Sequence, residues 1–376
     1  MVFQSKLELV AFVSFGSAAC AAVCYFVYTS GSNRSKKNRA GIKRQISGLH
    51  NLGTTCYANA LLQCLSSCQQ MVQWCDNAKD VAFLRSLNKL LKAVNGQQLT
   101  SQQASAWPVI DALESKGWRI SLRQQQDLFE LLNVFVATWD EELQRITCAN
   151  CQTKSTTYHS FQAMSLCLPG RGTTFGYQKV TLEHLLRNNF APEILNDYKC
   201  EGCLAKALNG APTTTTTTSK GAVVKRDWLA KLPSCLIIRL DRVALCPLSG
   251  LETKNDLPIA FGPNLDLTDF VLYRSKRLEY RLSANNSASG SGSSSNKTFF
   301  KELMVERLKH SYELKAVAVH AGSAAYGHYT AYRTTADDGH WYHVSDEYVK
   351  RSSLQEALCA QPYMLFYERV KRNSAV

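Results

Sequence analysis

The 376-residue sequence contains no internal repeat and no recognisable RNA- or DNA-binding motif. The first absence excludes solenoids and propellers, whose sequences repeat with periods of about 20–50 residues. Acidic residues are also few, 30 Asp and Glu against 43 Lys and Arg, which gives a formal net charge of +13. Such an excess can indicate a nucleic-acid partner, but six of the basic residues fall within positions 34–44. We therefore expect no nucleic-acid partner.

Charge is absent altogether from residues 9–28, LVAFVSFGSAACAAVCYFVY. Twenty residues in a helix suffice to cross a bilayer core of about 30 Å. The six basic residues follow this run, whereas only Lys6 precedes it, so the positive-inside rule directs the C-terminal part of the chain to the cytosol. The sequence predicts an N-terminal transmembrane signal anchor at residues 1–30 and a basic linker at 31–47.

A cleaved secretory signal peptide is the alternative interpretation of this run, since Ala19-Cys20-Ala21 resembles a cleavage site of small residues. The apolar run continues past that site to Tyr28, and most of the charge lies on the wrong side of it. These features favour an anchor. A short, mildly apolar anchor followed by basic residues is typical of the mitochondrial outer membrane, with the endoplasmic reticulum membrane as the alternative.

Four of the fourteen cysteines form two Cys-x-x-Cys pairs, Cys148 with Cys151 and Cys200 with Cys203, separated by 48 residues. Four thiolates suit a tetrahedral Zn²⁺ ion, with sulfur at about 2.3 Å. Because protein sulfur would occupy every position and leave none for water, we expect a structural zinc. The alternatives are four unrelated thiols or two disulfides, and disulfides are rare on the reducing, cytosolic side of a membrane.

Two further segments combine a thiol with an imidazole. Residues 48–59, GLHNLGTTCYAN, contain Cys56, and His328 in a Gly-His-Tyr triplet follows it by 272 residues. A helix is predicted over 56–66, capped by Thr54 or Thr55, so that Cys56 lies in its first turn. A helix N-terminus and an imidazolium both favour the thiolate. Although a buried structural thiol is the common alternative, this combination predicts a cysteine protease site.

The first segment resembles the cysteine box of the ubiquitin-specific proteases, a family of papain-like deubiquitinating enzymes. Residues 320–332, HAGSAAYGHYTAY, resemble the histidine box of that family. In this resemblance the Gly-His-Tyr histidine is His328, and His320 matches a position that is not the catalytic base. Residues 124–132 (QQQDLFELL) and 232–240 (LPSCLIIRL) resemble further family segments, and the resemblance covers about residues 47–368.

The resemblance implies an α+β, papain-like catalytic domain at residues 48–370, preceded by the transmembrane helix. Its subdomains would be a mostly helical thumb (about 48–145), zinc-binding fingers (about 146–240) and a palm (about 241–370). The composition of residues 285–296, almost entirely Ser, Gly, Asn and Ala, predicts a disordered loop at about 283–297.

The resemblance also implies roles for individual residues: Cys56 as the nucleophile, His328 as the base and Asn51 as an oxyanion donor, an effect worth about 3–4 kcal/mol in other hydrolases. Ser345, within WYHVSDEYV at 341–349, stands where most members carry Asp or Asn. A hydroxyl can fix the tautomer of an imidazole but supplies no negative charge. We assign Ser345 as the third triad residue by position, and Ser also occurs in the mitochondrial outer-membrane branch. Asp346 is the alternative, as the orienting group or as a polar partner near the oxyanion.

The implied activity is hydrolysis of the isopeptide bond at the ubiquitin C-terminus. Ubiquitinated proteins of the mitochondrial outer membrane would be the substrates, and their deubiquitination would oppose mitophagy, with some preference for Lys6-linked chains. A catalytically silent ubiquitin-binding module at the membrane is the alternative from a different class. A purely regulatory zinc protein is a third hypothesis, which explains the four thiols but neither of the two boxes.

Overall fold

The computed structural model describes residues 46–77, 82–97, 104–115, 118, 124, 126–135, 140–148, 154–161, 163–169, 180–196, 198, 223–245, 250, 252–271, 307–324, 326–335 and 339–371. All of them belong to one compact unit, residues 45–376. The predicted anchor, the linker up to residue 45 and the predicted loop at 283–297 lie outside these ranges. Within the ranges, none of the helices has the length and apolar character needed to span a membrane.

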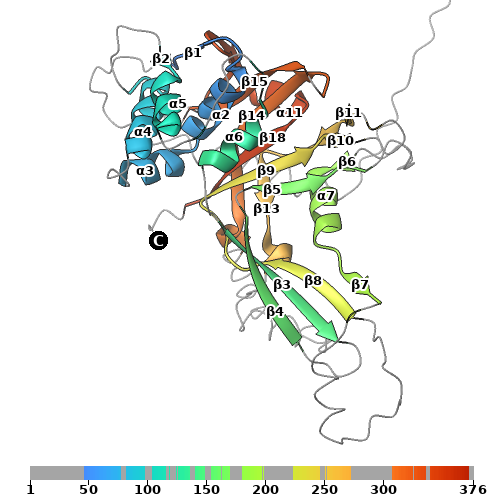
Figure 1. Cartoon of the computed structure of the whole chain (residues 1–376). Coiled ribbons are helices and arrows are strands. Elements are labelled where there is room, and N and C mark those ends of the chain that lie inside the picture. The colour runs from blue at the N-terminus through green and yellow to red at the C-terminus, as the bar shows by residue number, and fades with distance from the viewer. Residues whose placement is uncertain are drawn as a thin grey trace, which may run out of the picture. The chain divides into compact units, whose positions relative to one another are not determined.

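The largest sheet of the described chain has eight strands, in the order β17-β16-β15-β14-β18-β9-β5, with β13 beside β14 (Figure 1). Neighbours are antiparallel, except that β5 and β9 are parallel. Its strands are β5 (Met164–Cys167), β9 (Cys235–Asp241), β13 (Asn264–Asp266), β14 (Ser311–Gly322), β15 (Gly327–Thr334), β16 (Trp341–Ser345), β17 (Tyr348–Ser352) and β18 (Met364–Arg369). Most of these strands lie in the range predicted for the palm, so we call this the palm sheet. Its strands β5 and β9 come from the range predicted for the fingers or its end.

Both faces of the palm sheet are covered by apolar side chains. Along β18, Met364 and Phe366 pack in one core, whereas Leu365 and Tyr367 pack in the other. Residues 235–238 of β9 alternate in the same way. Side chains of a strand point to opposite faces in turn, so an uninterrupted apolar strand requires cover on both sides. This is why the LPSCLIIRL segment lies inside the sheet.

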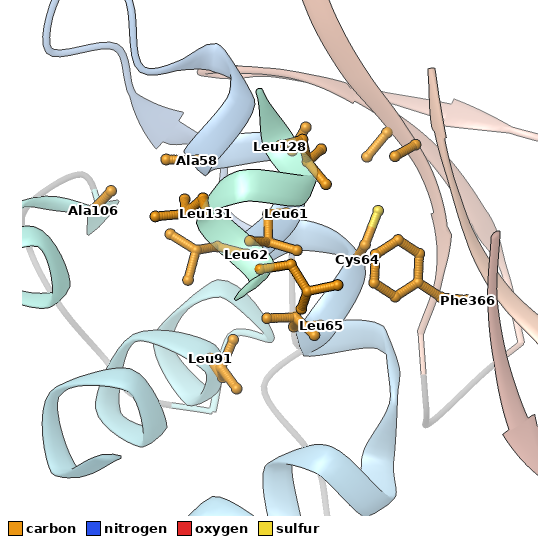
Figure 2. Packing of buried hydrophobic residues seen from close by; sticks show 14 of the residues in the cluster. Ala58, Leu61, Leu62, Cys64, Leu65, Leu91, Ala106, Leu128, Leu131 and Phe366 are labelled. Atoms are coloured by element: carbon orange, nitrogen blue, oxygen red, sulfur yellow. The ribbon is translucent and has the colours of Figure 1, made fainter. Parts of the chain in front are cut away.

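Helix α2 (Cys56–Ser67) lies in the first of these cores, and all twelve of its residues are buried. Figure 2 shows Leu61, Leu62 and Leu65 among the side chains of this core, together with residues of the neighbouring elements. The spacing of these leucines predicts a single apolar stripe, but α2 is buried on every side. A helix without a solvent-exposed face is one that other elements surround.

The elements that surround α2 come from both ends of the sequence. Strands β14 and β15 pack against it on the palm side and place Ala316, Ala318 and Ala331 in the shared core. Side chains this small let the helix approach the sheet closely. The thumb helices complete the cover: α3 (Gln69–Asn77), α4 (Ala82–Val94), α5 (Trp107–Glu114) and α6 (Leu128–Phe135).

A buried cation also joins α2 to the palm sheet. Arg333 of β15 is fully buried, and its guanidinium donates to the Gln63 side-chain oxygen at 2.9 Å. It also donates to the Ser66 hydroxyl and the Asn95 side-chain oxygen, each at 2.5 Å. Since Gln63 and Ser66 belong to α2, these bonds fix the helix on the strand that contains His328.

A second, four-stranded sheet has the order β4-β3-β8-β7 (Figure 1). Its antiparallel strands are β3 (Asp140–Cys148), β4 (Lys154–Phe161), β7 (Glu193–Leu195) and β8 (Val223–Leu229). It occupies the range predicted for the fingers, beginning slightly earlier. The smaller elements of the described chain are β1 (Leu49–His50), β2 (Ala104–Ser105), β6 (Val180–Thr181), α7 (Leu182–Asn189), β10 (Val243–Leu245), β11 (Glu252–Lys254), β12 (Ile259–Ala260), η1 (Thr268–Phe270) and α11 (Leu354–Cys359).

Candidate active site

Cys56 is the first residue of α2, the helix that packs against β15. Thr55 occupies the N-cap position, but its side chain makes no capping bond. Its hydroxyl instead accepts the Leu52 N–H at 3.0 Å and donates to the Asn51 Oδ1 at 3.3 Å. The amides of the first turn are thus left to the thiol, and the N–H groups of Cys56 and Tyr57 lower the pKa of Cys56.

Burial has the larger effect on this thiol. It raises the pKa of Cys56 above the usual value, because a thiolate is poorly solvated in the protein interior. The Asp346 carboxylate raises the pKa further, whereas a hydrogen bond from the Tyr329 backbone lowers it. The helix N-terminus therefore acts in the predicted direction, but burial outweighs it. The first-turn amides and the Tyr329 backbone lower the pKa of Cys56, and burial together with Asp346 raises it, with a net direction upward.

His328 lies on β15, immediately before Tyr329. The Tyr329 backbone forms a hydrogen bond with the Cys56 sulfur. The imidazole and the thiol are thus brought to the same end of α2. His328 Nε2 is 2.8 Å from the Ser345 hydroxyl oxygen, at the end of β16. When Nε2 carries the proton and donates it to Ser345, Nδ1 is left as the basic nitrogen.

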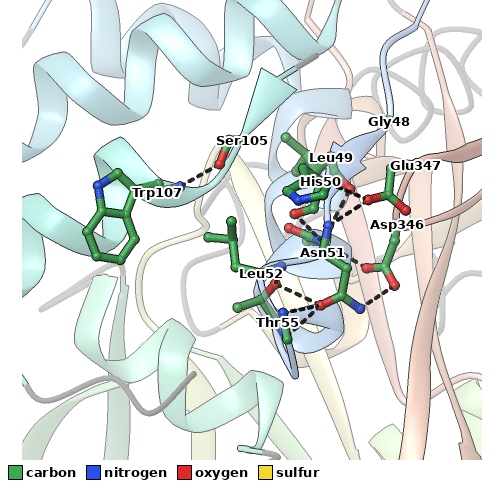
Figure 3. Close-up of polar contacts among 12 residues, drawn as sticks. Gly48, Leu49, His50, Asn51, Leu52, Thr55, Ser105, Trp107, Asp346 and Glu347 are labelled. Carbon is green, nitrogen blue, oxygen red and sulfur yellow. Dashed lines mark hydrogen bonds and ion pairs between the residues drawn. The ribbon is translucent and has the colours of Figure 1, made fainter. Parts of the chain in front are cut away.

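Asn51 and Asp346 are joined by their side chains (Figure 3). The Asn51 Nδ2 donates to Asp346 Oδ2 at 2.8 Å, and the Asn59 Nδ2 donates to Asp346 Oδ1 at 2.8 Å. The Asn51 Oδ1 accepts the Gly53 N–H at 3.0 Å. Among the contacts of the described residues, Asp346 has none to His328. Asp346 therefore lies beside the Asn51 side chain.

Asp127, for which the sequence predicted no role, contacts the strand that contains His328. Its Oδ1 accepts the Phe129 N–H at 2.7 Å at the start of α6. Its Oδ2 accepts the Tyr329 hydroxyl at 3.2 Å and also the Tyr363 hydroxyl. The carboxylate thereby ties a thumb helix to the strand of His328. An Asp before an apolar run signals a helix N-cap, but nothing local in the sequence indicates tyrosines 202 and 236 residues away.

The loop before His328 is tightly constrained. The His320 ring stacks on Tyr329, with 4.4 Å between ring centroids, and burial lowers the pKa of His320. A Cβ at Gly327 would lie 2.1 Å from His320 Nε2, so only glycine fits there. Lys254 donates to the carbonyls of His320 and Gly322 at 2.9 and 2.8 Å. These contacts fix both ends of the loop, and the His320 ring packs against Tyr329.

Of the four predicted zinc ligands, only Cys148 belongs to the described residues, as the last residue of β3. Cys151, Cys200 and Cys203 lie outside them. Across the described ranges, no group of three or more His, Cys, Asp or Glu residues is arranged to hold a metal ion. Backbone pairing is informative nevertheless: Cys148 and Leu195 both pair with Val223. The last residues of β3 and β7, after which the remaining three cysteines follow in sequence, therefore lie at the same end of the four-stranded sheet.

A thiol at the start of a buried helix that packs on the strand of a histidine is the arrangement of a papain-like cysteine protease. Residues 47–367 match the sequence profile of the family described as ubiquitin carboxyl-terminal hydrolase. The chain belongs to this family and is a cysteine-type deubiquitinating enzyme. The resemblance seen in the sequence is thus confirmed.

The individual relatives share only about a quarter of their residues with this chain. Ubiquitin carboxyl-terminal hydrolase 30 of Xenopus tropicalis is 27% identical over 458 residues, covering 95% of this chain and 86% of the relative. The human protein of the same name is 26% identical over 472 residues (94% and 89%). Ubiquitin carboxyl-terminal hydrolase 11 of Schizosaccharomyces pombe is 26% identical over 378 residues (92% and 90%).

Solved structures share the fold. The SAGA Ubp8/Sgf11/Sus1/Sgf73 DUB module bound to ubiquitin aldehyde contains a chain that superimposes with a TM-score of 0.64 at 20% sequence identity. The superposition covers 96% of this chain and 77% of that one. The predicted papain-like architecture of the catalytic domain is therefore confirmed.

Proposed function

We propose that this protein hydrolyses the isopeptide bond between the ubiquitin C-terminus and a substrate lysine, with Cys56 as the nucleophile and His328 as the base. His328 takes the thiol proton while the sulfur attacks the carbonyl carbon. When the C–N bond of the tetrahedral intermediate breaks, His328 gives the proton to the leaving amine, and ubiquitin remains as a thioester. Water then attacks the thioester carbonyl carbon and gives a proton to His328. The C–S bond breaks, His328 gives that proton to the Cys56 sulfur, and the ubiquitin carboxylate is released.

The observation that carries this proposal is the 2.8 Å contact between His328 Nε2 and Ser345 Oγ. His328 directly precedes Tyr329, whose backbone forms a hydrogen bond with the Cys56 sulfur. It supports an imidazole whose Nδ1 is free to act on the thiol. The raised pKa of Cys56 supports the same scheme, because a buried thiol needs a base to lose its proton during attack. Ser345 orients the ring without adding a charge.

Asn51 fits the role of oxyanion donor. A side-chain amide has two N–H groups, and one of those on Asn51 Nδ2 is bonded to Asp346. The other is available to the oxyanion, together with first-turn amides of α2. In this scheme Asp346 holds the donor amide in place, while Ser345 holds His328.

A ubiquitin probe with an electrophilic C-terminus tests the assignment. The wild-type protein should form a covalent adduct with the probe, and the Cys56→Ala variant should form none. A Cys64→Ala variant, which removes another buried thiol of the same helix, is the matched control and should be labelled. Equal labelling of wild type and Cys56→Ala would refute the assignment, and with it the proposed chemistry.

We also propose that Cys148, Cys151, Cys200 and Cys203 bind a structural Zn²⁺ ion. Because consecutive residues extend a chain by at most about 3.6 Å, the Cα of Cys151 lies within about 11 Å of that of Cys148. By the same bound, Cys200 lies within about 18 Å of Leu195. Both pairs can thus meet at one end of the four-stranded sheet, where the ion would cross-link two connections and stabilise their folding.

For its location we propose the mitochondrial outer membrane, with residues 1–30 as a single-pass anchor and the catalytic domain in the cytosol. Ubiquitinated outer-membrane proteins would be the substrates, so that the activity opposes mitophagy. The support is the uncharged run at 9–28, the basic residues after it and Ser345 at the triad position. The full-length chain should co-localise with mitochondria, and a chain lacking residues 1–30 should be diffuse; identical staining of the two would end this proposal.

A further inference from the structure

Glu347 connects two parts of the site that are remote in sequence. Its Oε1 accepts the Asn51 backbone N–H at 2.9 Å and lies 2.8 Å from His50 Nδ1 (Figure 3). Glu347 follows Asp346 in the two-residue turn between β16 and β17. One turn therefore contacts the candidate oxyanion donor twice, by Asp346 at the side chain and by Glu347 at the backbone.

The turn has little freedom to move away from residues 48–51. The Leu49 N–H donates to the Asp346 carbonyl at 2.9 Å. A Cβ on Gly48 would lie 2.4 Å from the Glu347 carbonyl oxygen, so the two backbones are in direct contact. Asp346 has a φ of 48°, in the left-handed region that Asp tolerates better than most residues. The Glu347 side chain thus extends from a fixed backbone.

We propose that Glu347 is a positioning residue, which acts by holding the backbone of Asn51 so that the side-chain amide of Asn51 points at the oxyanion. The inference rests on the proposed function, since it requires Asn51 to be the donor. A catalytic group displaced by about 1 Å can cost 10²-fold in rate. The hydrogen bond from Asn51, and then His50, lower the pKa of Glu347, so the carboxylate is ionised at neutral pH. An ionised acceptor makes the stronger hydrogen bond.

The test measures kcat and KM for ubiquitin that carries a fluorogenic amide at its C-terminus. Loss of a whole oxyanion donor costs about 10²–10³ in kcat, so a loosened donor in Glu347→Ala should cost about tenfold. KM should change less than about twofold, because ground-state binding is not affected. Glu347→Gln keeps an acceptor oxygen for the Asn51 N–H and should restore most of kcat. Glu347→Asp keeps the charge, but its shorter side chain cannot reach, so it should behave like Glu347→Ala.

The matched control is Glu313→Ala. It removes an exposed carboxylate that is paired with Lys315 near the start of β14. It should leave kcat at the wild-type value. A wild-type kcat in both Glu347→Ala and Glu347→Asp would overturn the inference, as would a raised KM with kcat unchanged. If Glu347→Ala does not fold, the Asp and Gln variants decide, and equal kcat values for these two would overturn it. Failure of the proposed function is distinguishable, because it would appear as turnover by Cys56→Ala.

Discussion

Replacing Ser345 by Ala should slow hydrolysis by an amount that the geometry allows to be worked out. The variant removes one hydrogen bond, between Oγ and His328 Nε2 at 2.8 Å. Such a bond contributes about 0.5–1.5 kcal/mol when both partners are neutral and about 1.5–3 kcal/mol when one is charged. In the tetrahedral intermediate His328 holds the thiol proton, so the second range applies. About 2 kcal/mol corresponds to about a 30-fold loss of kcat, at 1.36 kcal/mol for each factor of ten.

The assay is turnover of ubiquitin with a fluorogenic C-terminal amide, combined with a melting curve to show that the variant is folded. Ser345→Asp is the informative companion, because a carboxylate stabilises an imidazolium more strongly than a hydroxyl does. Its kcat should exceed that of Ser345→Ala. A wild-type kcat in a folded Ser345→Ala variant would refute the assignment of Ser345 as the orienting group.

A small alkylating reagent separates Ser345 from Asp346. Alkylation of Cys56 by iodoacetamide requires the thiolate but no oxyanion hole. Since the Asp346 carboxylate raises the pKa of Cys56, Asp346→Asn should alkylate faster than wild type at neutral pH while hydrolysing ubiquitin amides more slowly. Ser345→Ala should not alkylate faster. If Asp346→Asn instead slowed both reactions and Ser345→Ala slowed neither, Asp346 would be the orienting group.

Four further predictions concern stability and metal content. Arg333→Met should lower the free energy of unfolding in urea by about 3 kcal/mol or more, because it leaves the oxygens of the buried Gln63 and Ser66 and of the half-buried Asn95 without this donor. A loss under about 1 kcal/mol would contradict this. Gly48→Ala should lower the melting temperature and kcat together, since overpacking against the Glu347 carbonyl costs about 1–3 kcal/mol, and an unchanged melting curve would argue against that contact. Burial raises the pKa of Cys75 to about 12 and that of Cys64 well above its usual value, whereas thiols of the unfolded chain ionise near about 8.5. In the presence of a reductant, the free energy of unfolding should therefore fall as pH rises above about 8.5. Equal urea midpoints at pH 8 and pH 10 would contradict this pH dependence. Purified wild-type protein should contain about one zinc ion per chain, and the Cys148→Ser and Cys200→Ser variants should lose it. The control Cys167→Ser, which replaces an exposed thiol outside the pairs, should keep the zinc ion. Zinc retained by both Cys148→Ser and Cys200→Ser would exclude the proposed ligands.

Much of the framework could be predicted because it depends on local sequence. The start of α2 at Cys56 follows from turn residues before a run of helix formers, and β9 follows from a short apolar run that contains Ile237 and Ile238. The two boxes and the paired cysteines could be identified because each is a short stretch of specific residues at a fixed spacing in the sequence.

Other features could not be predicted, because they depend on atoms brought together from opposite ends of the chain. Asp127 contacts Tyr329 across 202 residues, and Glu347 contacts Asn51 across 296. The raised pKa of Cys56 has the same origin: the local helix amides favour the thiolate, whereas the surrounding core excludes the water that would solvate it.

The sequence by itself determined that this chain is a cysteine-type deubiquitinating enzyme, because the residues around Cys56 and His328 identify its family without any knowledge of the fold. Only the tertiary structure decided that Asp346 bonds Asn51 while Ser345 bonds His328. Adjacent side chains of a strand and its turn point in different directions, so one residue of register determines which of the two meets the imidazole.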